Sequence, residues 1–536
     1  MKAKFFFAAM AAIAVIGCQK ESGVQGEASG MASFLKVNLN TAGAITKADS
    51  GTFEYGSEAE NQVNSVTFYF FDADGEKYVV QNRENYMTGN VTDWAKGTDT
   101  VKNIEEISGL VLVIRQAQNG EHPAQMVAVL NAPAALKKSM TLAELNAQIK
   151  TLYDESNGFI MSNSVYSVDE NGAGTVIQTT AIKEDNLFPA NLNEGEPGYN
   201  APGTILKPGD VPAGAPVEIY VERVAAKVRV KNDPATLLPV YAEDGTTQMV
   251  DTKNTPVFVK IEGWDVTNNT DESHILKQLS ATYDPAPFTP WSVAALYRSY
   301  WANTTAEPAH DLNYGLNTTS PKYYHENTDQ ENNPQLLVAA RLVDKDGKAV
   351  DLAKWYDKHY TLADIQAAMV GSIDHRIYTK TTDEAGNTVL NSITAADVLF
   401  KQKDYTEPEK RYQVYMTEKE GVNYYDADGN EITSTVDGID PNNTAKHILE
   451  TVEPAQIWKE GMAYYYIDIQ HFGETKAMVR NHCYDITIDK IKGFGTPVFD
   501  PEQIIIPEKP EDSEAMNLAA RINILSWHLV EQNVIL

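Results

Sequence analysis

Hydrophobic and polar residues alternate along much of this chain with the two-residue period of a β-strand. The clearest example is residues 33–40, where Lys and Asn residues separate three apolar side chains, those of Leu35, Val37 and Leu39. This pattern predicts a strand with one buried face. Apolar runs between turn signals predict further strands over residues 63–71, 110–114, 126–130, 217–230, 256–261, 335–342, 464–469 and 484–491. Many short strands favour β-sandwich or barrel domains.

Helical patterns are few. The sequence Thr-Leu-Ala-Glu at residues 141–144 has the spacing of a capping box and predicts a short helix that ends near Leu152. Two other stretches are helix candidates, residues 351–369 and 394–401. The polar, Asn- and Thr-rich stretches at residues 265–330 and 403–450 have weak periodicity and predict long loops or insertions.

Acidic residues followed by Gly interrupt the strand pattern at four places: Asp72–Gly75, Asp244–Gly245, Asp344–Gly347 and Asp426–Gly429. Such sequences could form either hairpin turns or calcium-binding loops. They lack the spacing of an EF-hand loop, which has Gly at its sixth position and Glu at its twelfth. Hairpin turns are therefore the favoured interpretation.

The first eighteen residues have the organisation of a secretory signal. Two Lys residues precede an apolar run from Phe5 to Ile16 that is too short for a membrane span, and Gly17-Cys18 follows it. The ending resembles a bacterial lipobox, in which the Cys receives a diacylglyceryl group. Residues 1–17 are thus predicted to be a lipoprotein signal peptide and Cys18 the lipidated residue, with a soluble secreted protein as the alternative.

The composition limits the partners that this protein can have. Its 536 residues include 74 Asp and Glu against 44 Lys and Arg, a formal net charge of −30. This charge argues against binding nucleic acid through its phosphates and against docking on anionic lipid headgroups. Two Cys residues are too few for a disulfide scaffold, and Cys483 is expected to be a buried, inert thiol.

Residues with enzymatic chemistry do not stand out. Neither HExxH, GxSxG, a P-loop nor GxGxxG occurs in a convincing context. The dipeptides Asp374-His375 and His325-Glu326 stand alone, and Arg480-Asn-His482 is interpreted as a structural turn. No enzyme activity, metal or cofactor is predicted.

Five sequence motifs resemble those of one family. They are Val221-Glu-Arg-Val-Ala-Ala-Lys-Val228, Phe159-Ile-Met-Ser-Asn-Ser-Val-Tyr166, Tyr324-His-Glu-Asn-Thr328, Val479-Arg-Asn-His-Cys-Tyr-Asp-Ile-Thr-Ile488 and Ile491-Lys-Gly-Phe-Gly-Thr-Pro497. Each motif is weak alone, but in this order they are similar to the fimbrillins of Bacteroidia, the type V pilus subunits. The likeness is greatest to the major subunit of the short fimbriae.

This resemblance implies a mainly β protein with two tandem transthyretin-like Greek-key β-sandwich domains, a few short helices and long loops. The expected segments are a signal peptide (1–17), a propeptide with a cleavable strand (18–47), an N-terminal sandwich (48–230), a C-terminal sandwich with insertions (231–497), and an extended arm with a donor strand (498–536). The resemblance also implies a lipoprotein of the cell outer membrane that later forms part of a surface fimbrium and has a possible host or bacterial receptor.

The resemblance further implies maturation by a trypsin-like protease. The predicted cut lies between Lys47 and Ala48, in a loop rich in Gly, Ser, Thr and Asp. Relatives commonly have Arg before the cut, so Lys47 leaves the identity of the protease open. Cleavage would free the strand that contains Leu35, Val37 and Leu39 and would remove the high effective concentration that its covalent attachment gives it.

A competing strand is recognisable at the other end of the chain. Alternating apolar residues predict a donor strand with the side chains of Leu518, Ala520, Ile522, Ile524, Val530, Val534 and Leu536. Such a strand would join further copies of this chain and related subunits head to tail by strand addition. Two alternatives stay open: the tail could be an ordinary edge hairpin, and the protein could be a monomeric surface lipoprotein that binds glycan or host protein.

Overall fold

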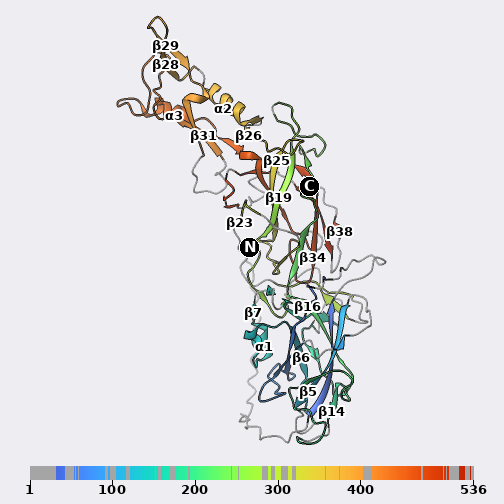
Figure 1. The fold of residues 1–536 in the computed structure, drawn as a ribbon. Coiled ribbons are helices and arrows are strands. Elements are labelled where there is room, and N and C mark those ends of the chain that lie inside the picture. Colours follow the sequence, from blue (N-terminus) through green and yellow to red (C-terminus); the bar gives the residue numbers. More distant parts are fainter. Residues whose placement is uncertain are drawn as a thin grey trace, which may run out of the picture.

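The computed structural model describes the chain with several gaps. The described residues are 32–42, 54, 56–57, 59–90, 95–96, 104–115, 121–150, 153–154, 158–169, 176–190, 194–242, 244–251, 253–279, 288–290, 296–303, 312–316, 321–356, 358–373, 375–402, 413–471, 475–498, 500–502, 504–505, 518–525 and 531–532. The described part is elongated and has three successive parts (Figure 1): an N-terminal sheet, a C-terminal sheet and a distal insertion.

The N-terminal sheet contains eleven strands, whose main order is β15-β5-β1-β16-β10-β6-β2-β3. They are β1 (Ala32–Ala42), β2 (Ser65–Phe71), β3 (Tyr86–Asn90), β4 (Ala95–Lys96), β5 (Ile104–Arg115), β6 (Gln125–Leu130), β10 (Met161–Asn163), β13 (Thr180–Ala181), β14 (Leu187–Pro189), β15 (Ile205–Leu206) and β16 (Val217–Arg223). Alternate residues from the long strands of this sheet meet in one apolar core. The other face of β2 and β6 is covered by helix α1 (Leu142–Asn146) and its neighbours, which explains the continuous apolar run in β2.

The C-terminal sheet contains ten strands, whose main order is β24-β17-β34-β18-β19-β25-β33-β35. They are β17 (Ala226–Val230), β18 (Leu238–Tyr241), β19 (Phe258–Thr267), β24 (Lys322–Tyr324), β25 (Gln335–Val343), β33 (Met462–Asp468), β34 (Cys483–Lys492), β35 (Thr496–Pro497), β37 (Leu518–Leu525) and β38 (Glu531–Gln532). The chain passes from one sheet to the other between Arg223 and Ala226, a few residues before the predicted boundary at residues 230 and 231.

The distal insertion joins β25 to β33, which are neighbours in the C-terminal sheet. It has its own apolar core and a five-stranded sheet in the order β27-β26-β32-β31-β30. Its elements are β26 (Leu352–Trp355), β27 (Lys358–Thr361), α2 (Leu362–Gly371), β28 (Tyr378–Thr382), β29 (Thr388–Ser392), β30 (Val398–Gln402), β31 (Gln413–Glu418), α3 (Ala445–Glu450) and β32 (Ala455–Trp458). In Figure 1 the hairpin of β28 and β29 lies at the tip of the molecule.

In the described part of the chain, four small strand groups lie outside the two large sheets and the distal insertion. They are β7 (Ile149–Lys150) with β20 (Ser273–His274), β8 (Tyr153–Asp154) with β9 (Gly158–Phe159), β23 (Leu312–Asn313) with β36 (Ile504–Ile505), and the sheet of β11 (Tyr166–Ser167), β12 (Val176–Ile177), β21 (Phe288–Pro290) and β22 (Tyr297–Ser299). Among the described residues, none of the helices is both long and apolar enough to span a bilayer.

The mainly β fold class predicted from the sequence is confirmed, and the predicted strands are present, except that residues 217–230 form two strands, β16 and β17, in different sheets. The capping box at Thr141 and Glu144 is also confirmed, although its helix is shorter than predicted. Two helix predictions need correction. The helix predicted from residue 351 begins only at Leu362, because the residues before it pair as β26 and β27. Residues 394–401 form a 3₁₀ turn and then β30, whose backbone groups bond to β31 instead of closing helical turns.

The prediction of loops over residues 403–450 is wrong for β31 and α3, which belong to the core of the insertion. The four acidic-Gly sequences are turns, as predicted. In the turn at Asp72, for example, the carboxylate accepts hydrogen bonds of 2.9 Å from the amides of Asp74 and Glu76, and Gly75 has a positive φ of 84°. Carboxylates at Asp344 and Asp426 accept the same pair of amide bonds.

Candidate functional site: the first strand, the tail and the domain junction

Strand β1 lies in the interior of the N-terminal sheet. It runs antiparallel to β5 over its whole length and parallel to β16 from Val37 to Thr41. The side chains of Leu35, Val37 and Leu39 are at most 1 % exposed and belong to the main apolar core. The sequence pattern therefore identified the buried face of this strand correctly.

The opposite face of β1 is also largely covered, which the sequence pattern did not predict. Ala32 and Phe34 are buried in a second cluster with Val111 and Val113 of β5. Further along this face, the amide of Asn38 donates a 2.7 Å hydrogen bond to the carboxylate of Glu218 on β16. Since β1 is paired on both sides and its core face is buried, its removal would leave an apolar groove.

The residues predicted for lipidation and cleavage, Cys18, Lys47 and Ala48, lie outside the described residues. The chain is described again from Glu54, and from there it contacts the C-terminal sheet. Both guanidinium nitrogens of Arg229 donate to Glu54, at 2.8 and 2.6 Å. The ammonium of Lys227 lies 2.7 Å from the carboxylate of Glu60.

Glu60 is almost fully buried at this contact. Burial alone would raise the pKa of its carboxyl group, but hydrogen bonds from Lys227, the Ser57 amide and Tyr323 lower it to about 2. A carboxylate held this strongly remains charged at neutral pH. Glu54 and Glu60, which lie between the predicted cut and β2, are therefore fastened to the C-terminal sheet.

The C-terminal tail forms β37, as the alternation in the sequence predicted. In the single chain, β37 runs antiparallel to β34 from Leu518 to Leu525, and the short β38 pairs with its outer edge. Three predicted donor residues, Val530, Val534 and Leu536, lie outside the described residues. The tail of a single chain thus forms an edge hairpin on its own C-terminal sheet, the arrangement that the sequence left open as an alternative.

The first part of the predicted arm packs on the same chain. Val498 is fully buried and its amide donates a 3.0 Å hydrogen bond to the carbonyl of Met462. A little further on, β36 pairs with β23. The arm is therefore fixed as far as Ile505, and any movement of the tail would have to pivot beyond that residue.

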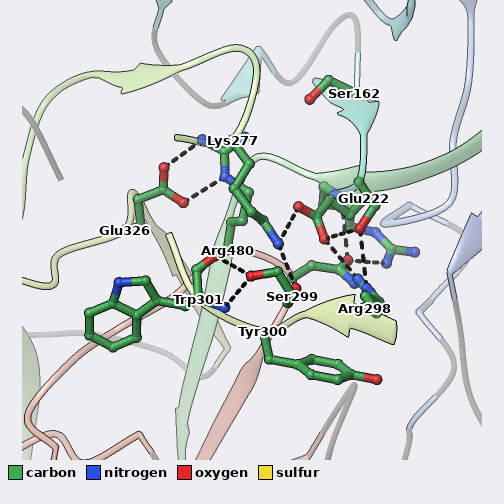
Figure 2. Close-up of polar contacts among 12 residues, drawn as sticks. Ser162, Glu222, Lys277, Arg298, Ser299, Tyr300, Trp301, Glu326 and Arg480 are labelled. Atoms are coloured by element: carbon green, nitrogen blue, oxygen red, sulfur yellow. Dashed lines mark hydrogen bonds and ion pairs between the residues drawn. The ribbon is translucent and has the colours of Figure 1, made fainter. Parts of the chain in front are cut away.

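A network of buried charges lies where the two large sheets meet (Figure 2). Glu222, at the end of β16, forms an ion pair with Lys277 at 2.6 Å and accepts a hydrogen bond from Arg298 at 2.8 Å, and all three side chains are at most 3 % exposed. Burial lowers the pKa of Lys277 to about 8 despite the opposing effect of Glu222. Glu222 stays charged because Lys277, Arg298 and Arg480 together outweigh the effect of burial and lower its pKa.

Arg480 forms the second half of this network. Its Nε donates a 2.6 Å hydrogen bond to Glu326, and its other nitrogens donate to the carbonyls of Ile275 and His274. Next to it, the side-chain oxygen of Asn481 accepts from the Arg223 guanidinium at 3.4 Å. The turn before β34 is thereby bonded to the end of β16, so the predicted structural role of residues 480–482 is confirmed.

Four of the five sequence motifs meet at this junction. They supply Ser164 and Glu222, which contact Arg298 and Lys277, and Glu326 and Arg480, which both contact Ser273. Sequence reasoning treated these motifs mainly as signs of resemblance and missed Lys277 and Arg298 altogether. Glu222 alternates with the apolar residues of β16 in the same way as the exposed Glu218, so no local signal marked it as buried.

Three other residues that the sequence singled out, Cys483, His325 and Glu326, are buried in the protein. Cys483 is buried and unpaired in the described chain, and burial raises the pKa of its thiol to about 12, which fits the prediction of an inert group. His325 and Glu326 are both buried, and Glu326 serves the junction. Among the residues that the structure describes, no group of three or more His, Cys, Asp and Glu is placed to hold a metal ion.

Comparison with known proteins gives one family match. Residues 456–533 match the model of the C-terminal region of fimbrillin, the major fimbrial subunit protein type IV. The family resemblance predicted from the sequence is thereby confirmed. The matched region includes β33, β34, the Arg480 turn and β37, and the match supports a fimbrial or adhesin-like subunit.

Several solved structures are similar to the chain at low identity. A protein from Parabacteroides distasonis presumed to act in cell adhesion has 12% identity and a TM-score of 0.36, with 92% of this chain and 96% of that chain covered. A protein of the same description from Bacteroides eggerthii has 9% identity and a TM-score of 0.32, covering 91% and 95%. A fimbrial assembly protein from P. distasonis has 11% identity and a TM-score of 0.29, covering 67% and 99%. No curated protein matches the chain.

Proposed function

We propose that this protein is a structural fimbrial subunit that polymerises by donor-strand exchange. One observation carries the proposal: β1 is paired on both sides, between β5 and β16, and its core face is fully buried, yet it lies before the predicted cleavage site. Its loss would expose an apolar groove along the main core. Such a groove is a template for a strand from another chain.

The C-terminal tail is the proposed occupant of the groove. Residues 518–525 already have strand conformation, and β37 is held at the edge of its own sheet by β34 and a two-residue β38. The twelve residues between Ile505 and Leu518 would span about 40 Å when extended. Transfer of the tail to the groove of a neighbour would make a head-to-tail contact, which generates a filament when it does not close into a ring.

The energy of exchange comes mainly from apolar burial. Each buried aliphatic side chain contributes roughly 1.5–3 kcal/mol, and the edges of β5 and β16 supply backbone hydrogen bonds. Before cleavage, β1 holds the groove at a high effective concentration, so a second chain competes poorly. Cleavage at Lys47 by a trypsin-like protease would remove this advantage and make assembly depend on maturation.

The proposed route begins with a lipoprotein precursor attached to the outer membrane through Cys18 and ends with a surface-exposed fimbrium that serves adhesion. The negative charge of the chain fits this role, since like-charged subunits need buried apolar joints to remain associated.

The test compares the full-length protein with three variants, using ladders on non-boiled gels after trypsin treatment. Wild-type protein should form ladders, whereas Lys47→Ala and a deletion of residues 516–536 should remain folded monomers. Lys36→Ala is the matched control, since it removes a Lys from β1 itself and should still assemble. Monomers in every sample would contradict the proposal and favour a monomeric binding lipoprotein.

A further inference from the structure

The central segment of β1 has a close counterpart in the tail. Residues 35–39 read Leu-Lys-Val-Asn-Leu, and residues 520–524 read Ala-Arg-Ile-Asn-Ile. Both segments place apolar residues at the first, third and fifth positions, a cation at the second and Asn at the fourth. The match goes beyond the apolar alternation that any half-buried strand requires.

The environment of the Asn in β1 explains why that position matters. Asn38 is opposite Gly109 on β5 and Glu218 on β16, and its amide donates the 2.7 Å hydrogen bond to Glu218. A Cβ atom at residue 109 would lie only 3.3 Å from the side-chain oxygen of Asn38. The Gly and the carboxylate thus form a slot for a short amide side chain on the face opposite the core.

We propose that the tail enters the groove in the register of β1, with Asn523 of one copy beside Glu218 of the next copy. In this register Arg521 takes the place of half-buried Lys36, and Ile522 takes the place of Val37 in the core. The tail then runs parallel to β16 and antiparallel to β5, as β1 does. Glu218 becomes the residue that specifies the register. This inference rests on the proposed function.

The other registers considered lose both matches, that of the cation with Lys36 and that of Asn523 with Asn38. A shift of two residues in one direction keeps the apolar alternation but places Arg521 beside Glu218. A reversed strand direction, with Ile522 still at the position of Val37, also places Arg521 there. A shift of two residues in the other direction places Leu525 there, so that an apolar side chain faces a carboxylate. Only the proposed register pairs cation with cation and Asn with Asn along the strand.

Disulfide trapping between two copies tests this register. One full-length protein carries Glu218→Cys and the other carries Asn523→Cys or Arg521→Cys, and both are matured by trypsin before mixing and oxidation. Residues opposite each other on neighbouring strands have Cα atoms about 4.7–4.9 Å apart, within the range of about 4.4–6.8 Å that disulfides need. The proposal expects a crosslinked dimer with the 523 variant and little with the 521 variant, because each copy carries only one of the two introduced Cys residues.

Each other outcome has a distinct meaning. Preferential crosslinking of the 521 variant would overturn the register, and so would a polymer that crosslinks with neither variant, while strand exchange itself would stand. If wild-type protein forms no polymer, the proposed function fails and the register falls with it.

Substitutions that change the charges at residues 523 and 218 provide a second test, which measures the rate of ladder formation and needs no introduced Cys. Asn523→Asp should slow ladder formation roughly threefold, because two carboxylates would face each other across neighbouring strands. Glu218→Lys in the receiving copy should restore the rate. Asn442→Asp, which adds the same charge to an exposed residue of the insertion, is the matched control and should have no effect. Failure of the Lys variant to rescue would contradict the contact.

Discussion

The first strands of the two large sheets have the same topological place but different chemistry. β1 lies parallel to β16, the last long strand of its sheet, and β17 lies parallel to β34, the last long strand of the C-terminal sheet before the tail. β17 follows β16 after two residues and is joined to the chain at both ends. It also carries Lys227 and Arg229, which pair with Glu60 and Glu54.

Within the described residues, β1 lacks ion pairs like those of β17, and the predicted cleavage would break its covalent connection to the rest of the chain. The side chains that hold it are apolar, apart from the contact of Asn38 with Glu218, and its link to the rest of the chain contains the predicted cleavage site. The comparison teaches that topological position alone does not make a strand exchangeable. Under the proposed function, covalent connection and specific ion pairs would decide which of the two strands is available for exchange.

The largest loss of stability is expected at the junction between the two large sheets, because its charged groups are buried. Glu326→Ala would leave the fully buried Arg480 without its carboxylate and should destabilise the protein by about 3–5 kcal/mol. Glu262→Ala is the control, since its pair with Arg341 is partly exposed and should contribute about 1 kcal/mol or less. Urea denaturation of the two variants measures the difference, and equal losses would contradict the importance of the junction.

A matched pair of core substitutions tests the comparison directly. Val37 in β1 and Val228 in β17 are both fully buried, and Ala at either position should destabilise the uncleaved protein by roughly 2 kcal/mol. After maturation, Val37→Ala should leave the polymer as stable as wild type, because its strand has departed, whereas Val228→Ala should still weaken it. Thermal denaturation before and after trypsin treatment distinguishes the two, and a polymer weakened by Val37→Ala would show that β1 is retained.

Acid should weaken the C-terminal sheet through His325, beside β24. Burial and the nearby Arg480 lower the pKa of His325 to about 4, from about 6.5 in the unfolded chain, although Glu326 opposes this. The unfolded chain therefore binds the proton first, and stability falls as pH decreases from 6.5 to 4, by roughly 2 kcal/mol. His325→Gln should flatten this part of the pH profile of urea midpoints, whereas the exposed His375→Gln should not. An unchanged slope in His325→Gln would contradict the assignment.

The smallest effect is expected from a substitution that enlarges an apolar side chain of the tail. In the proposed register, Ala520 occupies the place of the fully buried Leu35 and leaves space there. Ala520→Leu should fill that space and slow dissociation of the polymer in urea about tenfold, equivalent to about 1.4 kcal/mol. Unchanged or faster dissociation would place residue 520 elsewhere than the Leu35 pocket.

Much of the strand pattern could be predicted because it depends on neighbours in sequence. The alternation around Val37 and the apolar run before Asp72 reflect local burial, and both appear as strands. Predictions failed where tertiary pairing overrode a helical pattern, as at residues 351–361. The junction could not be predicted, because Glu222, Lys277 and Arg480 are far apart in sequence and no periodicity links them.

The sequence by itself determined the mainly β character, the acidic turns, the buried face of β1 and the strand at the C-terminal tail, because spacing and turn chemistry are local properties. Only the tertiary structure decided that β1 lies between β5 and β16, that its second face is also covered, and that the tail of a single chain pairs with β34. These features depend on which distant strands become neighbours, and long-range pairing leaves no mark in the sequence of either partner alone.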